Sequence, residues 1–161
     1  MAKQLHAQID IQATPDRVWE VLTDFAAYPQ WNPFITQAHG TARVGERLTN
    51  RMQPVGGRGI TLRPTVLEAD PGRRLRWLGH MLAPGIFDGD HTFTIQQLGD
   101  GQVRLVQQEQ FRGLLAPLMA KSLDRHTLPA IELMNQALKR RAEHPQPSEP
   151  PGPTGGESVR R

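Results

Sequence analysis

The order of the predicted elements limits the possible folds more than any other feature of the sequence. Between residues 34 and 112, short segments of alternating apolar and polar residues are separated by turn sequences, and one long helical segment follows. A run of antiparallel strands with helices outside the run is typical of an α+β domain. We therefore predict a curved antiparallel sheet of about seven strands wrapped around a long C-terminal helix. One helix covers the concave face of such a sheet only partly, so side chains or a ligand must fill the remaining volume.

The N-terminal region predicts one strand followed by two short helices. Residues 4–12 alternate apolar and polar side chains, as a half-buried strand does. Thr14 is a good helix N-cap and Pro15 suits the first helical position, so a helix is expected to begin there. Pro29 and Pro33 end this helical region, because proline lacks a backbone N–H and clashes with the preceding turn.

The C-terminal helix is predicted to begin near Pro117 and to reach about residue 143. Pro129 lies inside this segment and is expected to kink or divide it. Thr127 is placed to cap a second helical segment that restarts after the break.

Two turn sequences give the expected register of the later strands. Pairing the ends of Asp-Pro-Gly-Arg at residues 70–73 predicts the opposite pairs Val66 with Trp77 and Leu62 with Met81. The second turn is Gly-Asp-Gly at residues 99–101, and a three-residue loop there predicts the pairs Leu98 with Gln102, Ile95 with Leu105, Phe93 with Gln107 and His91 with Glu109.

The chain is expected to contain one folded domain and a tail. Residues 1–143 are within the usual length of a single domain. Residues 144–161 hold five of the 14 prolines and almost no apolar residue. Such a segment cannot bury enough surface to offset its ordering entropy, so a disordered Pro/Gly-rich tail is predicted.

Composition excludes several classes of function. The net charge of +3 carries no concentrated basic stripe, so no nucleic-acid partner is expected. There is no cysteine and the six histidines show no ligand spacing, so neither a metal nor another cofactor is expected. No apolar run approaches the roughly 18–20 residues that span a bilayer, although peripheral membrane contact and the oligomeric state stay open. A cytoplasmic location is the default expectation.

Four segments carry a resemblance to a known superfamily. In order they are T-P-D-R-V-W-E-V-L-T-D-F-A-A-Y-P-Q-W-N-P-F, R-R-L-R-W-L-G, G-I-F-D-G-D-H-T-F-T-I and Q-Q-E-Q-F-R-G. In their order and spacing they resemble the START-like superfamily (SRPBCC), which has the helix-grip fold and includes the Bet v 1-type proteins and the polyketide cyclase/dehydrase and lipid-transport group. The superfamily includes lipid carriers, quinone chaperones, hormone receptors, cyclases and activators of a chaperone ATPase, so the resemblance does not decide the function.

Side chains of the sheet and of the long helix are expected to line an internal cavity. Binding cavities are mostly apolar, with a few placed polar groups. The alternative for each residue is that it simply fills the core, because aromatic and aliphatic side chains usually do. The candidates from the sheet are Leu62, Val66, Trp77, Phe93, Leu105 and Phe111, and those from the helix are Met119 and Leu123.

Three polar residues, His91, Gln107 and Glu109, alternate onto the same side as these apolar candidates. A carboxylate there is costly unless it is paired, and His91 lies across the hairpin from Glu109. The pair could orient a ligand hydroxyl or carbonyl, or serve as general base and acid on an enolisable carbonyl. His91 and Glu109 are therefore the candidate catalytic residues. The structural alternative is a satisfied polar pair at the sheet rim, or Glu109 bound to an arginine.

The sequence is compatible with three functions. The first is binding or transport of a hydrophobic small molecule, such as a lipid, a quinone or a polyketide-like aromatic, without catalysis. The second is a polyketide cyclase or dehydratase that uses the Glu109–His91 pair. The third is an interaction module, resembling the chaperone-ATPase activators, that works through an outer face bearing Arg63, Arg74 and Arg76.

Overall fold

The computed structural model describes residues 2–145, and its strands form two antiparallel sheets. The larger sheet has the order β1-β8-β7-β6-β5, with bounds Lys3–Ile11, Gln102–Arg112, Phe87–Gly99, Arg74–Met81 and Thr65–Asp70. The smaller sheet has the order β2-β3-β4, with bounds Ile35–His39, Thr49–Met52 and Ile60–Leu62. Of the tail predicted for residues 144–161, all but the first two residues lie outside the described part of the chain.

The helices come in two groups, one between β1 and β2 and one after β8. The first group is α1 (Pro15–Thr23), the 3₁₀ turn η1 (Phe25–Ala27) and α2 (Tyr28–Trp31). The second group is α3 (Ala116–Ser122), the π-helical turn η2 (Leu123–Thr127) and α4 (Leu128–Glu143). The predicted α+β class, with short helices after the first strand and a long C-terminal helix, is confirmed. Within the described residues, no helix is both long and apolar enough to span a membrane.

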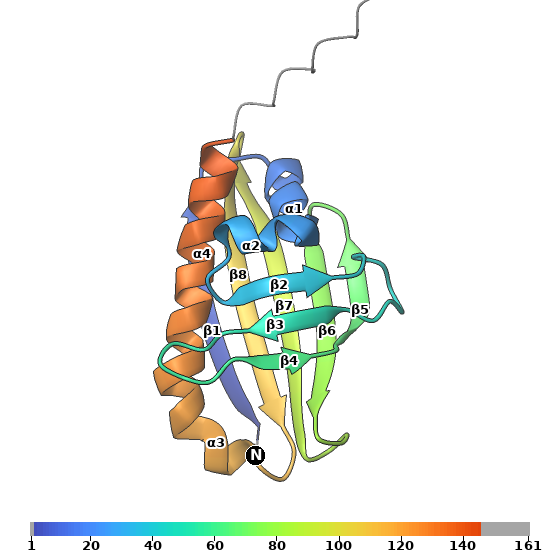
Figure 1. Ribbon diagram of the computed structural model, residues 1–161. Coiled ribbons are helices and arrows are strands. Elements are labelled where there is room, and N and C mark those ends of the chain that lie inside the picture. The colour runs from blue at the N-terminus through green and yellow to red at the C-terminus, as the bar shows by residue number, and fades with distance from the viewer. Residues whose placement is uncertain (1, 146–161) are drawn as a thin grey trace, which may run out of the picture.

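The layers leave space over one face of the larger sheet. In Figure 1, α4 runs beside β1 on one side of the larger sheet, and the smaller sheet crosses over β6 and β7. Helix and small sheet thus cover different parts of the same concave face. The strands predicted to form one curved sheet therefore form two sheets, and the smaller sheet provides a second wall that faces the larger one.

The register of the β5–β6 hairpin differs from the prediction at the turn and agrees with it farther along. Asp70 pairs with Arg74, and a bulge between Val66 and Glu68 then brings Val66 opposite Trp77 as predicted. A bulge adds one residue to one strand and so corrects a one-residue offset.

The predicted pairing of Leu62 with Met81 is wrong. Leu62 lies on β4 in the smaller sheet, where it pairs with Asn50. Pro64 separates β4 from β5, and proline cannot donate a hydrogen bond within a ladder.

The β7–β8 hairpin confirms the three inner pairs. Ile95 lies opposite Leu105, Phe93 opposite Gln107 and His91 opposite Glu109. The predicted pair of Leu98 with Gln102 is wrong, because a register shift between Gln97 and Gly99 brings Gly99 opposite Gln102.

The C-terminal helix is divided at the expected place but without the expected cap. Pro129 lies in the first turn of α4, directly after the π-helical turn. The prediction that Thr127 caps α4 is wrong, since its φ of −89° and ψ of −45° are helical and its side chain makes no capping hydrogen bond. The chain stays helical through the break, so there is no true helix start to cap.

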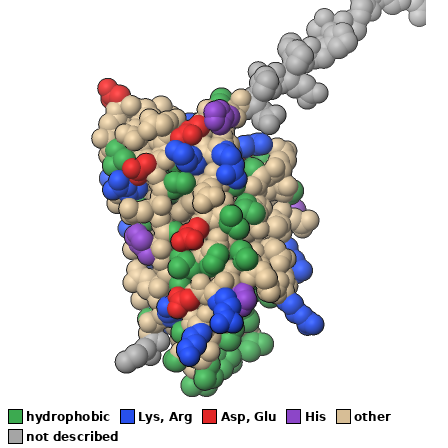
Figure 2. Space-filling view, turned by 90° about the vertical axis from the view of Figure 1, so that its left-hand side faces the viewer, with side chains coloured by type: hydrophobic (Ala, Val, Ile, Leu, Met, Phe, Trp, Pro, Cys, Tyr) green, Lys and Arg blue, Asp and Glu red, His purple; other side chains and the backbone are tan. Residues whose placement is uncertain are grey.

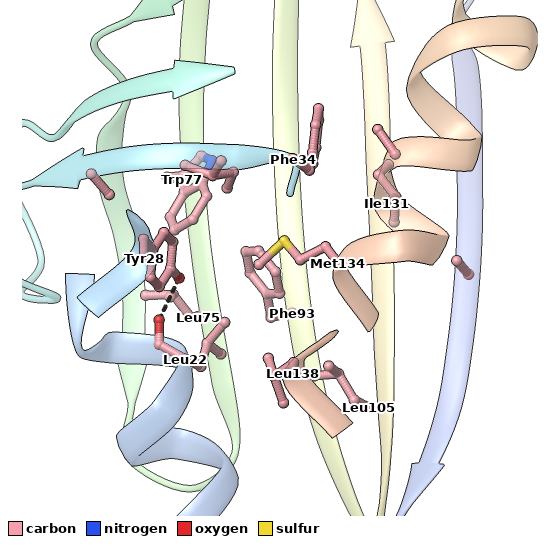
Figure 3. Packing of buried hydrophobic residues seen from close by; sticks show 14 of the residues in the cluster. Leu22, Tyr28, Phe34, Leu75, Trp77, Phe93, Leu105, Ile131, Met134 and Leu138 are labelled. Atoms are coloured by element: carbon pink, nitrogen blue, oxygen red, sulfur yellow. Dashed lines mark hydrogen bonds between the residues drawn. The ribbon is translucent and has the colours of Figure 1, made fainter. Parts of the chain in front are cut away.

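The hydrophobic core lies between the larger sheet, α4 and the N-terminal helices. Figure 3 shows Phe93 and Leu105 of the sheet facing Met134, Ile131 and Leu138 of α4. On the other side, the Tyr28 hydroxyl donates a hydrogen bond to the Leu22 carbonyl oxygen. Burial of that hydroxyl raises the pKa of Tyr28 far above its ordinary value. This packed core occupies one end of the concave face.

Candidate functional site

A cavity of about 350 Å³ occupies the other part of the concave face. It lies between the larger sheet, the smaller sheet and the α3–η2 segment. Its walls are mostly apolar, which is typical of sites for small hydrophobic molecules. The sheets contribute Asn50, Met52, Ile60, Leu62, Trp77, Gly79, His80, Met81, Phe87, Gly89, Glu109 and Phe111, the helical segment contributes Met119, Ser122, Leu123, His126 and Thr127, and the loops contribute Phe34, Pro54, Gly57, Arg58 and Pro64.

Two glycines in strand interiors make room for the cavity. Gly79 on β6 and Gly89 on β7 are directly paired, and both line the wall. A Cβ atom on Gly89 would lie 3.4 Å from Glu109 Oε1 and 3.5 Å from Phe111 Cε1. A glycine inside a strand often marks a close approach by a ligand or another chain segment. This pair of glycines is the sequence signal for the cavity, and the pattern of apolar side chains does not contain it.

Aromatic rings form much of the wall around these glycines. The rings of Phe87 and Phe111 are stacked with centroids 5.3 Å apart. Trp77 is held by edge contacts to Phe25 and Phe93, with centroid distances of 6.4 and 5.1 Å. Rings fixed by their neighbours offer a preformed apolar surface, which reduces the entropy lost when a ligand binds.

The structure separates the predicted site residues into two groups. Leu62, Trp77, Glu109, Phe111, Met119 and Leu123 line the cavity. The remaining five are buried but are not among the lining residues, and they are Val66, His91, Phe93, Leu105 and Gln107. Alternation indicates which face of a sheet a side chain takes, but it does not show that α4 covers one end of that face.

A chain of buried polar groups leads from the cavity wall into the core. Glu109 Oε2 lies 3.5 Å from His91 Nδ1, and His91 Nε2 is 2.8 Å from Gln107 Oε1. Gln107 Nε2 in turn donates to Asn135 Oδ1 of α4 at 2.7 Å. The His91 ring also stacks on Phe93, with centroids 4.4 Å apart. His91 and Gln107 therefore connect Glu109 in the cavity wall to Asn135 in the core.

Two asparagines of this region were not predicted. Asn135 ends the polar chain, and Asn50 on β3 lines the cavity with only 1% of its surface exposed. Both lie on elements far in sequence from the β7–β8 hairpin, so no local pattern connects them with Glu109. The structure gives Asn50 Oδ1 no hydrogen-bond partner among the described residues.

Loops join the elements around the cavity mouth. The β3–β4 loop is tied to η2, since Val55 N donates to the His126 carbonyl oxygen and His126 Nδ1 lies 2.7 Å from the Val55 carbonyl oxygen. The β6–β7 loop is tied to the start of the helical segment, because Gly85 O accepts from Leu114 N at 3.1 Å. Gly57 and Arg58 of the β3–β4 loop line the cavity.

Asp88 holds the β6–β7 loop and gives it a pH dependence. Its hydrogen bond with His80, and a second from the Gly85 N–H, hold the pKa of Asp88 below its ordinary value of 3.8. A lowered folded-state pKa stabilises the loop above the unfolded-state pKa, and this contribution is lost as the pH falls through the folded-state value. We expect the hydrogen-exchange protection factor of the Gly85 amide to fall between pH 6 and pH 3.

The variant Asp88→Asn supplies the control for this pH dependence. It should show low Gly85 protection at both pH values, because an amide carries no charge at either. A protection factor in the unmodified protein that is the same at pH 6 and pH 3 would contradict the assignment.

The arginines of the outer face are largely paired with acids. Arg76 makes a two-point ion pair with Asp90, at 2.8 and 2.6 Å, and Arg74 lies 3.3 Å from Glu68. Arg63 lies between β4 and β5 rather than within a strand. The face predicted to carry Arg63, Arg74 and Arg76 thus presents less unpaired charge than the sequence alone implies.

One protein family matches nearly the whole described part of the chain. The family model described as "Polyketide cyclase / dehydrase and lipid transport" matches residues 2–143. No curated protein matches the chain significantly in sequence.

Solved structures with the same fold share little sequence with the chain. A START superfamily protein from Mycobacterium smegmatis is 20% identical with a TM-score of 0.68, covering 87% of this chain and 97% of that one. A hypothetical protein, jhp0584, from Helicobacter pylori is 18% identical with a TM-score of 0.74, covering 87% and 88%. The Zhui aromatase/cyclase from Streptomyces sp. R1128 is 17% identical with a TM-score of 0.67, covering 88% and 96%. At these identities the likeness shows the fold alone.

Proposed function

The chain belongs to the polyketide cyclase/dehydrase and lipid transport family, and from that premise we propose that it binds and carries a hydrophobic small molecule in the cavity. A lipid, an isoprenoid quinone and a polyketide-like aromatic are the ligand classes considered. The observation that carries the proposal is the apolar cavity of about 350 Å³ with one buried carboxylate, Glu109, in its wall. The volume is within the range of about 300–1,000 Å³ that small-molecule sites occupy.

The energetics of burial support this role. Removing about 300 Å² of ligand apolar surface from water contributes about 7 kcal/mol at roughly 25 cal/mol per Å². Part of this is offset by the lost freedom of the ligand, and the prearranged rings of Trp77, Phe87 and Phe111 keep that cost low. A dissociation constant between about 10 μM and 1 mM, which corresponds to about 4–7 kcal/mol, is therefore the expected scale.

Native mass spectrometry of gently purified protein, followed by titration with the neutral dye Nile red, tests the proposal. We expect a co-purifying apolar molecule or saturable binding of one dye per chain. Leu114 and Leu118 are about four-fifths exposed, and apolar side chains gather at the lower end of the molecule in Figure 2. The variant Leu118→Ser therefore controls for surface binding and should leave the affinity unchanged. Absence of both a bound molecule and saturable dye binding would overturn the proposal.

A second candidate is an enzyme of the cyclase or dehydratase type, favoured by the 3.5 Å approach of His91 Nδ1 to Glu109 Oε2. A carboxylate in the cavity wall could remove a proton from the carbon next to a ligand carbonyl, with His91 stabilising the pair. Glu109→Gln should then lower turnover of a poly-β-ketone substrate at least about a hundredfold and leave its affinity nearly unchanged. Equal loss of turnover and affinity would favour binding alone.

A further inference from the structure

We propose that the cavity selects a ligand with a neutral hydroxyl group, an alcohol or a phenol, over the carboxylic acid with the same apolar body. The hydroxyl donates a hydrogen bond to Glu109 Oε1. This inference rests on the proposed binding function and names the chemistry of the ligand's polar end. It follows from the protons of the buried polar chain, taken one residue at a time from α4 to the cavity.

The hydrogen bonds of Gln107 determine which nitrogen of His91 carries a proton. Gln107 Nε2 donates to Asn135 Oδ1 at 2.7 Å, so the group that Gln107 turns toward His91 is its Oε1. An amide oxygen only accepts hydrogen bonds. His91 Nε2, at 2.8 Å from that oxygen, therefore carries a hydrogen.

The two facing buried atoms of His91 and Glu109 determine the net charge of the pair. His91 Nδ1 and Glu109 Oε2 are both buried and face each other at 3.5 Å, and neither has a hydrogen-bond partner among the described residues. Two lone pairs facing each other in a buried site would be strongly unfavourable, so one proton lies between these atoms. Imidazolium with carboxylate and imidazole with carboxylic acid are the two forms, and each has zero net charge.

Glu109 Oε1 is the atom of the pair that would contact the ligand. A Cβ atom on Gly89 would lie 3.4 Å from Glu109 Oε1, and both residues line the cavity. With the shared proton on the Oε2 side, Oε1 is an acceptor in both forms of the pair. Asn50 Oδ1, buried and without a partner among the described residues, belongs to a second lining residue and adds acceptor capacity. The oxygens of Glu109 and Asn50 in the wall therefore require a hydrogen-bond donor.

Charged ligand groups are unfavourable beside Glu109 Oε1. A ligand carboxylate would bring acceptor oxygens against Oε1, and an ammonium group would bring a charge that the neutral pair does not balance. The basic side chains of the wall, Arg58, His80 and His126, are all at least partly exposed to solvent. A neutral O–H group is what remains.

Three fluorescent probes with one apolar body test the selection. They are pyrenebutanol, its methyl ether and pyrenebutyrate, titrated at pH 8, where the last is an anion. We expect the alcohol to bind at least about tenfold more tightly than either of the others, because tenfold corresponds to about 1.4 kcal/mol, the scale of one hydrogen bond. Glu109→Gln should reduce the preference for the alcohol over the anion at least about fivefold. Glu132→Gln, an exposed glutamate on α4 outside the cavity wall, is the matched control and should retain the full preference.

The outcomes separate this inference from the binding function itself. If the anion or the ether binds as tightly as the alcohol, the selection is overturned while the cavity stays a binding site. If none of the three probes binds, both proposals fail. If Glu109→Gln does not fold, the comparison of the three probes on the unmodified protein still decides.

Discussion

Replacing Gly89 with leucine should weaken ligand binding at least about a hundredfold while the protein remains folded. The new Cβ atom would stand 3.4 Å from Glu109 Oε1 and 3.5 Å from the Phe111 ring, which is ordinary contact distance. The rest of the side chain would extend into the cavity beside Gly79, its partner on β6. Lost burial and a blocked carboxylate together account for the roughly 2.7 kcal/mol that a hundredfold represents. Dye titration measures the affinity, and thermal unfolding checks the fold.

Gly99→Leu is the matched control for this substitution. Gly99 ends the same strand, β7, and a Cβ atom there would have open space around it. The control should bind ligand like the unmodified protein. Full affinity in Gly89→Leu would mean that the ligand does not occupy this part of the cavity.

Replacing Gln107 with leucine should lower the free energy of unfolding by about 2–5 kcal/mol. Gln107 is fully buried and joins His91 to Asn135 with hydrogen bonds of 2.8 and 2.7 Å. Leucine fills a similar volume but leaves His91 Nε2 and Asn135 Oδ1 without partners, at about 1–3 kcal/mol for each buried group. Urea denaturation measures the change.

A double-mutant cycle distinguishes the lost hydrogen bond from simple repacking. In Gln107→Leu/Asn135→Leu, the Asn135 amide that loses its partner in the single variant is itself removed. The double variant should therefore be more stable, by at least about 1 kcal/mol, than the summed effects of the two single substitutions predict. Gln8→Leu, at an exposed position of β1, should change stability by no more than about 0.5 kcal/mol. Strict additivity in the cycle would show that the two amides do not act as a unit.

Local sequence patterns predicted the hairpins of this fold well. The turn residues at positions 70–73 and 99–101 brought Val66 opposite Trp77 and His91 opposite Glu109, as the structure has them. The register failed at two places: Asp70 pairs one residue farther along than predicted until a bulge between Val66 and Glu68 restores the register, and a register shift between Gln97 and Gly99 displaces Leu98. A bulge is one extra residue on one strand, and neither site carries a turn signal that would reveal it.

The contacts between distant elements were not predictable in the same way. Alternation placed Leu105 and Phe111 on one face of β8, but only the position of α4 decides that Leu105 lies in the core and Phe111 in the cavity wall. The cavity contacts of Asn50 likewise depend on how the smaller sheet folds over the larger one. Gly79 and Gly89 could have indicated the cavity, since glycine is unusual inside strands and often marks a close approach by a ligand. Considering only large apolar side chains does not reveal them.

The π-helical turn η2 links the length of the chain to the shape of the binding site. A π turn contains one residue more than an α turn, because its backbone hydrogen bonds join residues five apart rather than four apart. Leu123, His126 and Thr127 of this turn face the cavity, and so do Met119 and Ser122 on α3 before it. Deleting one residue here would restore the α pitch and rotate α3 by about 100° relative to α4, turning both α3 side chains away from the wall. A one-residue change in the length of this helix would therefore reshape the binding site even with every lining side chain kept.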